Sequence, residues 1–367
     1  MFSQKVLSNL LKQNRSFFND LVAIRENLSR RFVGMDDQIH CLVLAVASGE
    51  SMLMIGPPGT AKSRLVRAFA QMAELITKDE YASGPTDVED NNDGKARRYE
   101  GNDKYFEYLL TPFTEPSELF GFYDIGKLLK TGDEGGQMTR LEAGMMQHAE
   151  VVFLDEVFNA SSAILNSLLT FVNEKKFHDR GASYEVKLST LFGATNFPPK
   201  RTELLAIFDR FLLRSWAENA NSDPSDIGTL LQAGWKETNA ADADIVFPGI
   251  LEKATKFRKS IEDMSVKGEL AIDPEDDDTN LLVTRLSDVV KEARRSRLSL
   301  LSNRRLIRFS KIFLANALLR SAANGAASPQ VDVKGELSLL IRFGLDRKPD
   351  PNQMNRFDGM YVEGKST

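Results

Sequence analysis

The stretch GPPGTAKS at residues 56–63 constrains this chain more than any other feature of its sequence. It follows the apolar run SMLMI and leads into KSRLVRAFAQMA, whose apolar residues recur at helical spacing. A strand, a glycine-rich turn and a helix in this order form a phosphate cradle, because backbone N–H groups and the helix N-terminus face the anion. Lys62 is then placed to reach the β- and γ-phosphates, and Ser63 to bind Mg²⁺. We therefore predict a nucleotide site; the alternative is a Gly-Pro turn that binds nothing.

One residue departs from the usual pattern G-x-x-x-x-G-K-[ST], because Ala61 stands where the second glycine is expected. Glycine is needed only where φ is positive or where a Cβ would strike the ligand. Residue 61 lies where the helix begins, so we expect a helical φ for Ala61. Gly59 is the residue to which we assign the special backbone angle.

Short apolar runs alternate with helix-period segments between residues 31 and 216. The runs are apolar at consecutive positions, as expected of strands that are covered on both faces. Strands that alternate with helices predict a parallel α/β sheet. The expected strands are 51–55, 106–111, 151–155 and 188–194.

Two segments interrupt this alternation, and a third region follows it. The polar stretch 84–104 is expected to be a surface loop, and 120–144 contains a short helix-like IGKLLK before a Gly-rich turn. After Trp216 a linker leads into a helical region with expected helices at 245–264, 280–300 and 303–323. The acidic run DPEDDD at 273–278 is expected to be a solvated loop rather than a metal site, because no ligand pattern follows it.

Polar side chains follow two of the expected strands. The strand VVFLD ends in Asp155 and is followed by Glu156, and the strand LFGAT is followed by Asn196. Ligands bind at the carboxyl ends of the strands in open α/β sheets. We expect Asp155 to hold Mg²⁺, Glu156 to orient and deprotonate the attacking water, and Asn196 to position that water or sense the γ-phosphate. The alternative for Asn196 is a plain turn residue.

Arginines near two helices are candidates for stabilising transition-state charge. Arg210 follows the apolar segment LLAIF, and a buried ion pair with Asp209 is the structural alternative to an arginine finger acting on a neighbouring subunit. Arg304 and Arg305 open a helix in LLSNRRLIRF, and one of them is a candidate for contacting the γ-phosphate.

Together these motifs resemble the MoxR family of AAA+ ATPases, and most of all its RavA branch. The resemblance rests on GESMLMIGPPGTAKS, YFEYLLTPFTEPSELFG, the stretch from RLEAGMMQHAEVVFLDEVF to VNEKKF, FDRFLLRSW and LLSNRRLIRF. In that family an alanine in the phosphate loop is usual. The resemblance implies an AAA+ P-loop core, with a parallel sheet flanked by helices, followed by a C-terminal all-α lid.

The resemblance also implies a role for each matching residue. It places Walker A at 56–63, Walker B at Asp155 and Glu156, sensor 1 at Asn196, the arginine finger at Arg210 and sensor 2 at Arg304. Lys62, Glu156, Asn196 and Arg210 are the expected catalytic residues, and Ser63 and Asp155 the expected Mg²⁺ ligands. VGMDDQ at 33–38 matches the start of the adenine pocket. The expected ATP-binding residues are Gly56, Pro57, Pro58, Gly59, Thr60, Ala61, Lys62, Ser63, Arg64, Val33 and Arg304.

At the level of domains, the resemblance implies an N-terminal helix (1–30), the ATP-binding core (31–216), the lid (217–346) and a C-terminal tail (347–367). The core would carry a helix-2 insert within 120–144 and a hairpin at 177–186, both of which touch a client protein. A homo-oligomer, in the form of a hexameric ring, is implied. The family's usual partner is a von Willebrand factor A (vWA) protein, expected here on a separate chain, and a defence effector is another possible client. Whether Arg304 acts on its own nucleotide or on a neighbour's is open.

Composition narrows the remaining classes. With 367 residues, 42% hydrophobic residues and 27% charged residues, the chain is typical of a soluble protein of two domains. Its net charge of −5 gives no general attraction to nucleic acid or to acidic membranes. The N-terminus reads as an amphipathic helix rather than a signal peptide, and no run is apolar enough to span a membrane, so we expect a cytoplasmic protein. Cys41, the single cysteine, is expected to be buried, and the three histidines are too scattered to predict a metal site.

Two rival functions are left open. An ATPase motor of a nucleic-acid-associated or antiviral complex finds support in the basic region 291–308, although this region has no interleaved aromatic residues for base stacking. A scaffold that binds ATP but hydrolyses it slowly is the second rival. The basic residues are Lys291, Arg294, Arg295, Arg297, Arg304, Arg305 and Arg308.

Overall fold

A computed structural model of the protein describes residues 4–84, 86–89, 95–98, 103–129, 140–179, 182–219, 223–238, 245–270, 277–326 and 328–362. Its strands are β1 Met52–Ile55, β2 Thr86–Glu89, β3 Lys95–Arg98, β4 Tyr105–Leu109, β5 Val151–Asp155, β6 Lys176–Asp179, β7 Ala182–Glu185, β8 Thr190–Thr195 and β9 Leu213–Trp216. The helices of the first half are α1 Gln4–Arg31, α2 Asp36–Ser48, α3 Lys62–Met72, α4 Lys78–Ser83, α5 Pro116–Phe120, α6 Ile125–Leu129 and α7 Ser162–Glu174. Those of the second half are α8 Leu205–Phe208, α9 Pro224–Thr238, α10 Ile250–Val266, α11 Asp277–Arg295, α12 Asn303–Ala323, α13 Val333–Phe343 and α14 Pro351–Val362.

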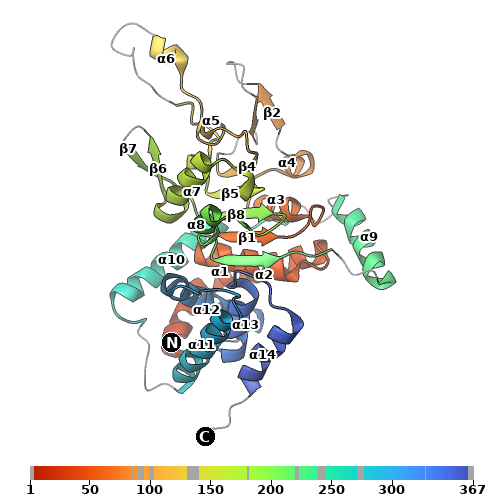
Figure 1. Cartoon of the computed structure of the whole chain (residues 1–367), viewed down its shortest axis with the longest axis vertical. Coiled ribbons are helices and arrows are strands. Elements are labelled where there is room, and N and C mark those ends of the chain that lie inside the picture. The colour runs from red at the N-terminus through yellow and green to blue at the C-terminus, as the bar shows by residue number, and fades with distance from the viewer. Residues whose placement is uncertain are drawn as a thin grey trace.

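A five-stranded sheet lies at the centre of the molecule (Figure 1), with its strands in the order β4-β5-β8-β1-β9. Every pairing in this sheet is parallel, as the sequence predicts. Because neighbouring strands run the same way, all their carboxyl ends meet at one edge, which we call the carboxyl edge. The opposite edge, where the strands begin, is the amino edge. The observed strands confirm each of the four expected runs to within a few residues.

The two faces of the sheet contribute to two different cores. In β1, Met52 and Met54 join the core that contains α1, α2, α3 and the C-terminal helices, whereas Leu53 and Ile55 join the core built around α7. Alternate residues of a strand point to opposite faces, so a strand that is buried on both faces must be apolar throughout. This explains why MLMI is a strand despite its lack of alternation.

The N-terminal helix α1 packs against α10, α12 and α2 and shares their core. Phe18 makes edge contacts with Phe17 at 5.2 Å and with Phe257 of α10 at 4.9 Å between ring centroids. Aromatic pairs in this geometry add to the free energy of burial. The first helix of the chain therefore holds the sheet and the C-terminal helices together.

The segments that interrupt the sheet project from it, at the top of Figure 1. β6 and β7 pair antiparallel at the position of the hairpin predicted for 177–186. In the segment 84–104, predicted as a loop, β2 and β3 also pair antiparallel, which corrects that prediction for the residues they contain. Helix α6 lies in the 120–144 segment, whose expected Gly-rich turn falls largely outside the described residues.

The C-terminal region is helical, as the sequence predicts. α12 coincides with the expected 303–323, while α10 and α11 are displaced by several residues from their expected ranges. The segment expected as a tail contains α14, which packs against α11 and buries Phe357. Four residues of the acidic run 273–278 lie outside the described residues, and the last two, Asp277 and Asp278, begin α11 rather than belonging to the expected loop. Within the described ranges, no helix combines the length and the hydropathy needed to cross a membrane.

Candidate functional site

The loop between β1 and α3 lies directly against the carboxyl edge. The N–H of Gly56 donates to the carbonyl of Thr195 at the end of β8, at 3.1 Å. A Cβ on Gly56 would lie 2.2 Å from the carbonyl oxygen of Ala217, so only glycine fits there. Gly59 has a φ of +85°, as predicted for the residue with the special backbone angle. The loop conformation therefore requires glycine at residue 56 and favours it at residue 59.

The prediction for Ala61 is wrong. Its φ is +54° and its ψ is 24°, so it is left-handed although it immediately precedes α3. Its carbonyl accepts a hydrogen bond from the N–H of Leu65 at 2.9 Å, and the residue therefore caps the helix from outside. Two left-handed residues, Gly59 and Ala61, are needed to turn the chain from β1 into α3. For an alanine this conformation costs about 1 kcal/mol.

The side chain of Lys62 folds back into the loop. Its Nζ donates to the carbonyls of Gly56 at 2.7 Å and of Pro57 at 2.9 Å, and the residue is buried. Burial lowers the pKa of Lys62, while the nearby carboxylates of Asp155 and Glu156 act in the opposite direction. The lysine of the loop and the two acids that end β5 therefore lie within electrostatic reach of one another.

Glu156, at the end of β5, is held by hydrogen bonds with Asp155 and Asn196. Glu156 is left-handed, with a φ of +52°, and its N–H donates to Asp155 Oδ1 at 2.9 Å. The side-chain amide of Asn196 donates to Glu156 Oε1 from the end of β8. Burial raises the pKa of both carboxyls; Asp155 raises that of Glu156 further, and Lys62 opposes the rise in each. A carboxylate with a raised pKa is a better base near neutral pH, which suits Glu156 for accepting a proton.

The remaining residues of the loop fit a magnesium-bound phosphate group. Ser63 is half-buried in the first turn of α3, and its hydroxyl and the Asp155 carboxylate are oxygen ligands of the kind that Mg²⁺ takes. Among the described residues no group of three or more His, Cys, Asp or Glu forms a metal cage. Arg64 is exposed, and its Nε donates to the Tyr81 hydroxyl at 3.2 Å.

A pocket of about 480 Å³ lies between the sheet and the C-terminal helices. Trp216, which lines it, is in register with Ile55, the residue directly before the phosphate loop. The predicted segment 33–38 contributes Gly34, Asp36, Asp37 and Gln38 to the lining, while half-buried Val33 does not line the pocket. Asp37 forms an ion pair with Arg342 of α13 across the pocket. A pocket of this size beside the loop is the natural place for the base of a nucleotide.

Sequence reasoning missed two groups of residues at this edge. Arg342 is one, because nothing local marks a lid arginine as a neighbour of Asp37. The other is the pair of Arg67 on α3 and Glu107 on β4, whose Nη2 and Oε1 atoms are 2.6 Å apart. Glu107 raises the pKa of Asp155 and Arg67 lowers it. A glutamate inside an apolar strand was the available signal for this pair.

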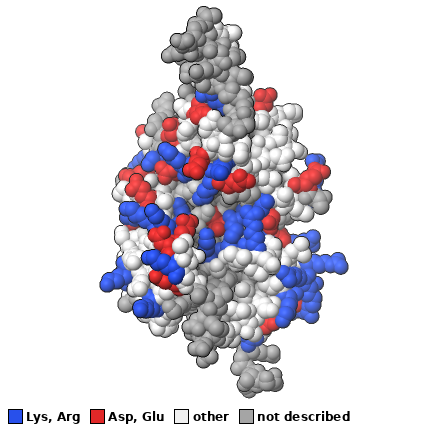
Figure 2. Space-filling view, turned by 90° about the vertical axis from the view of Figure 1, so that its left-hand side faces the viewer, with Lys and Arg blue, Asp and Glu red and all other residues white. Residues whose placement is uncertain are grey.

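The structure places Arg210 and Arg304 at the amino edge, away from the phosphate loop. Arg210 precedes β9, and Arg304 lies in the first turn of α12, where it lines a pocket together with residues that precede β1. Burial lowers the pKa of Arg210, and nearby Arg304 lowers it further. Arg210 Nε is buried and has no hydrogen-bond partner among the described residues. Figure 2, which faces this edge, shows Lys and Arg side chains gathered near its middle.

Arg305, the other arginine of that helix start, is structural. It is buried, and its Nη1 donates to Asp346 Oδ1 at 2.7 Å and to Ser299 Oγ at 3.1 Å. Buried Arg214 donates to the same Asp346 oxygen at 2.6 Å. Of the two candidates in LLSNRRLIRF, only Arg304 is exposed.

The fold and the site together define a class of protein. A phosphate loop after an inner strand of a five-stranded parallel sheet, with acids at the end of β5, an amide after β8 and a helical C-terminal region, is the AAA+ ATPase fold with a helical lid. The chain belongs to the MoxR family. The family model described as "MoxR domain in the MoxR-vWA-beta-propeller ternary systems" matches residues 19–82 and 96–251.

Several known proteins are similar to this chain over part or all of its length. Two uncharacterized proteins of Methanocaldococcus jannaschii are each 37% identical over 194 residues, which is 53% of this chain and 43% of theirs. A structural protein of Acidianus two-tailed virus is 28% identical over 191 residues, 52% of this chain and 26% of its own length. The matched part thus spans less than half of these relatives. The crystal structure of a candidate ATPase from Cytophaga hutchinsonii has a TM-score of 0.59 at 13% identity and covers 97% of this chain and 98% of its own, which supports the fold.

Proposed function

We propose that this protein is a Mg²⁺-dependent ATPase that works in a ring, hexameric by resemblance, to remodel, activate or assemble partner proteins. The observation that carries the proposal is the meeting of Lys62, Asp155 and Glu156 at the carboxyl edge, with Asn196 bonded to Glu156. The phosphate loop, a base and a water-positioning amide are the groups that phosphoryl transfer to water requires.

Each of these residues has a chemical task in the proposed reaction. Lys62 exchanges its bonds to the carbonyls of Gly56 and Pro57 for bonds to phosphate oxygens. Glu156, held by Asn196, accepts the proton of the attacking water. Ser63 and Asp155 would hold Mg²⁺, which neutralises charge on the phosphates when bound.

Arg210 and Arg304 are proposed to complete the ATP site of a neighbouring subunit. They lie close together at the amino edge, whereas the phosphate loop is at the carboxyl edge of the same sheet. Neither arginine can therefore serve the phosphate loop of its own chain in this arrangement. In a ring, one subunit presents its arginines to the next one's nucleotide, which couples hydrolysis to movement between subunits.

A mixing experiment tests both parts of this proposal. Glu156→Gln and Arg210→Ala proteins are each prepared and then combined in a 1:1 ratio. Each alone is expected to lose nearly all ATPase activity, and the mixture is expected to regain part of it. Sites that combine the intact Glu156 of one subunit with the intact Arg210 of the other explain the recovery. Size-exclusion chromatography with ATP and Mg²⁺ reports the ring. A mixture as inactive as its components, under conditions where the subunits exchange, contradicts an arginine supplied by the neighbour.

The partner is proposed to be a protein that carries a von Willebrand factor A domain, in the manner of the RavA branch. The family description, which names MoxR–vWA systems, supports this proposal. The projecting elements α6 and β6–β7 are the proposed contact points for the client (Figure 1). We propose that the protein acts in the cytoplasm. Affinity purification of the Glu156→Gln protein from its native cells, in the presence of ATP, identifies the client. Recovery of a nuclease or other defence effector instead of a vWA protein would redirect the assignment.

The nucleic-acid alternative loses much of its support in the structure. Within the basic region 291–308, ion pairs engage Arg295 with Glu292 at 2.6 Å, Lys291 with Asp288 at 3.5 Å, and Arg308 with Glu50. Arg305 is buried. Charges that are neutralised within the chain contribute little to phosphate-backbone binding. Salt-dependent DNA or RNA binding that stimulates ATP hydrolysis would restore this alternative.

A further inference from the structure

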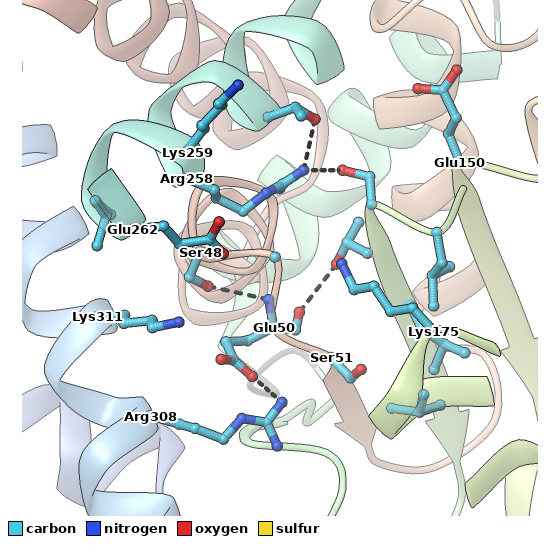
Figure 3. Close-up of a pocket in the computed structure, with 18 of the residues that line it drawn as sticks. Ser48, Glu50, Ser51, Glu150, Lys175, Arg258, Lys259, Glu262, Arg308 and Lys311 are labelled. Atoms are coloured by element: carbon cyan, nitrogen blue, oxygen red, sulfur yellow. Dashed lines mark hydrogen bonds and ion pairs between the residues drawn. The ribbon is translucent and has the colours of Figure 1, made fainter. Parts of the chain in front are cut away.

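A second pocket, of about 670 Å³, opens at the amino edge of the sheet between the core and the lid (Figure 3). Its walls come from the residues before β1, the end of α7, the residues leading into β8, and helices α10 and α12. The phosphate loop contributes none of its lining residues. Pockets of this size hold ligands as large as a nucleotide or an inorganic polyphosphate.

The lining of this pocket is rich in positive charge. It contains seven Lys or Arg residues and four Asp or Glu residues, on a chain whose net charge is −5. Two of the four acids have cationic partners: Glu50 pairs with Arg308, and Glu150 with Lys104 at 3.4 Å from outside the pocket. The other two acids, Glu262 and Asp263, are exposed on α10, and the Glu262 carboxylate acts to raise the pKa of Arg258 and of Lys175. The excess of cations is thus concentrated in one concave surface.

Lys175 and Lys311 reach into the pocket from opposite sides. Figure 3 shows the Lys175 ammonium group extending from the end of α7 and that of Lys311 from α12, with Glu50 between them. Neither ammonium group makes a hydrogen bond or an ion pair within the described part of the chain. Although the Lys175 side chain is reached by solvent, the surrounding protein lowers its pKa; Arg258 lowers it too, and Glu50 opposes this. These cations therefore gain from a bound anion.

Arg258 supplies a third, more rigid cation. Its guanidinium group donates to Ser189 Oγ at 3.0 Å, to the Val46 carbonyl at 3.1 Å and to Thr255 Oγ1 at 3.0 Å. All three acceptors are neutral, so these hydrogen bonds orient the guanidinium group without neutralising its charge. Three cations on α7, α10 and α12 thus face one space.

We propose that this pocket, which Arg304 also lines, is a second anion site, separate from the phosphate loop of the same chain, that binds a polyphosphate group through Lys175, Lys311 and Arg258. These three cations are distinct from Arg210 and Arg304, which are proposed to reach a neighbour's nucleotide. Several phosphate charges in one small ligand match cations that approach from three different elements, which a single carboxylate does not. The polyphosphate is either inorganic or the tail of a nucleotide, since both present the same chemistry. Bound there, it bridges the core to the lid helix that begins beside Arg304.

Isothermal titration of the full chain with inorganic tripolyphosphate, without divalent cations, tests this site. The Lys62→Ala background weakens the phosphate loop, so that the second site dominates the signal. We expect one saturable site in Lys62→Ala, and at least about tenfold weaker binding when Lys175→Gln and Lys311→Gln are added, because each lost charge removes a charge-assisted contact. Lys256→Gln is the matched control, since Lys256 is exposed on α10 and does not line the pocket.

The outcomes separate the possible sources of the anion and also allow refutation. ATP that competes with tripolyphosphate in the Lys62→Ala protein assigns the site to nucleotide tails, and ATP that does not compete assigns it to inorganic polyphosphate. Equal loss of affinity in Lys256→Gln and in the pocket variants overturns the proposal, as does AMP binding as tightly as tripolyphosphate. Should the triple variant not fold, Lys311→Glu alone, at an exposed position of α12, must weaken binding. Because no readout involves hydrolysis, a failure here leaves the proposed ATPase untouched.

Discussion

The two edges of the central sheet carry opposite chemistry. At the carboxyl edge, two acids and an amide surround a lysine that is bonded into its own loop. At the amino edge, arginines and lysines gather, with Arg210 next to Arg304. The two edges are separated by a four-residue strand, about 13 Å long. In the proposed function, one copy of this chain presents the hydrolytic half of a site at one edge and the charge-stabilising half at the other, so that two copies would form a complete site.

Glu156→Gln is the strongest test of the carboxyl edge. The amide keeps an oxygen that accepts the hydrogen bond from Asn196 but cannot take a proton from water. We expect the ATPase rate to fall by about 10²–10⁴-fold, with nucleotide binding retained. Steady-state phosphate release and binding of a fluorescent ATP analogue measure the two quantities.

Glu174→Gln is the control for this substitution, because Glu174 is exposed at the end of α7, pairs with His178 and is not one of the residues predicted for the ATP site. Its ATPase rate should match that of the unmodified protein. A Glu156→Gln protein that hydrolyses ATP normally would point to the slow-turnover scaffold instead.

The second prediction concerns the contacts of α12 with α13 and α2, which position Arg304 at the amino edge. Helix α12 carries Arg304 at its start, and at its middle Asn316 donates to Glu336 of α13 at 2.9 Å. Asn316 Oδ1 also lies 3.1 Å from His40 Nε2 of α2. Glu336 is completely buried, and burial raises its pKa from 4.5 to about 7, with Arg320 opposing the rise. The folded state therefore holds the Glu336 proton more tightly than the unfolded state does.

From this shift, the Glu336 contribution to stability is present below pH 4.5 and is lost as the pH rises to about 7. His40 acts in the reverse sense. Burial lowers its pKa from 6.5 to about 4, so its contribution is present above pH 6.5 and is lost as the pH falls toward 4. In the unmodified protein the two effects partly cancel between these limits.

Glu336→Gln should remove the contribution of Glu336 to the pH dependence of stability and leave that of His40. We expect the variant to be more stable than the unmodified protein at pH 8 by up to about 3 kcal/mol, and to show stability that rises with pH between 4 and 6.5. Urea unfolding at a series of pH values measures both. Identical pH profiles for the two proteins would mean that Glu336 does not titrate in this range.

A third test concerns the ion pair between Arg67 and Glu107, whose charges both act on the pKa of Asp155. Glu107→Gln removes the charge of the carboxylate that pairs with a partly buried guanidinium group, and should reduce the free energy of unfolding by about 2 kcal/mol. It should also lower the pKa of Asp155, because Glu107 raises it. Tyr105→Phe is the control, since it removes one hydrogen bond of 3.0 Å to Glu107 and keeps the ion pair. Urea midpoints that shift equally in both variants contradict a role for the charge.

Much of this arrangement could be predicted from the sequence because it is local or follows from parallel strands. β5 and α12 begin and end at the predicted residues, since VVFLD is a continuous apolar run that ends in an acid and 303–323 has apolar residues at helical spacing. Asp155 and Asn196 were expected together because residues that end parallel strands meet at one edge, and both lie at that edge.

What could not be predicted depends on contacts between distant segments. The pairing of Arg308 with Glu50, the bonds of Arg305 to Asp346, and the packing of α1 on α12 join residues far apart in the chain. No period or short motif encodes such pairs, so the basic region 291–308 looked more available than it is. The left-handed backbone of Ala61 belongs here too, because its conformation is set by how the loop meets the sheet.

Ala61 also provides the smallest and most local test. Ala61→Gly should relieve the left-handed strain of about 1 kcal/mol, partly offset by the greater freedom of glycine in the unfolded chain. The net result is a gain in stability below about 1 kcal/mol in urea unfolding. Ala73, at the other end of α3, has a φ of −84°, so Ala73→Gly should instead lose about 0.5–1 kcal/mol. The two substitutions make the same chemical change at the two ends of one helix, but Ala61 is left-handed and exposed whereas Ala73 has an ordinary backbone angle and a buried methyl group, so the expected signs are opposite. Equal destabilisation by both would show that the left-handed turn at Ala61 is not a source of strain.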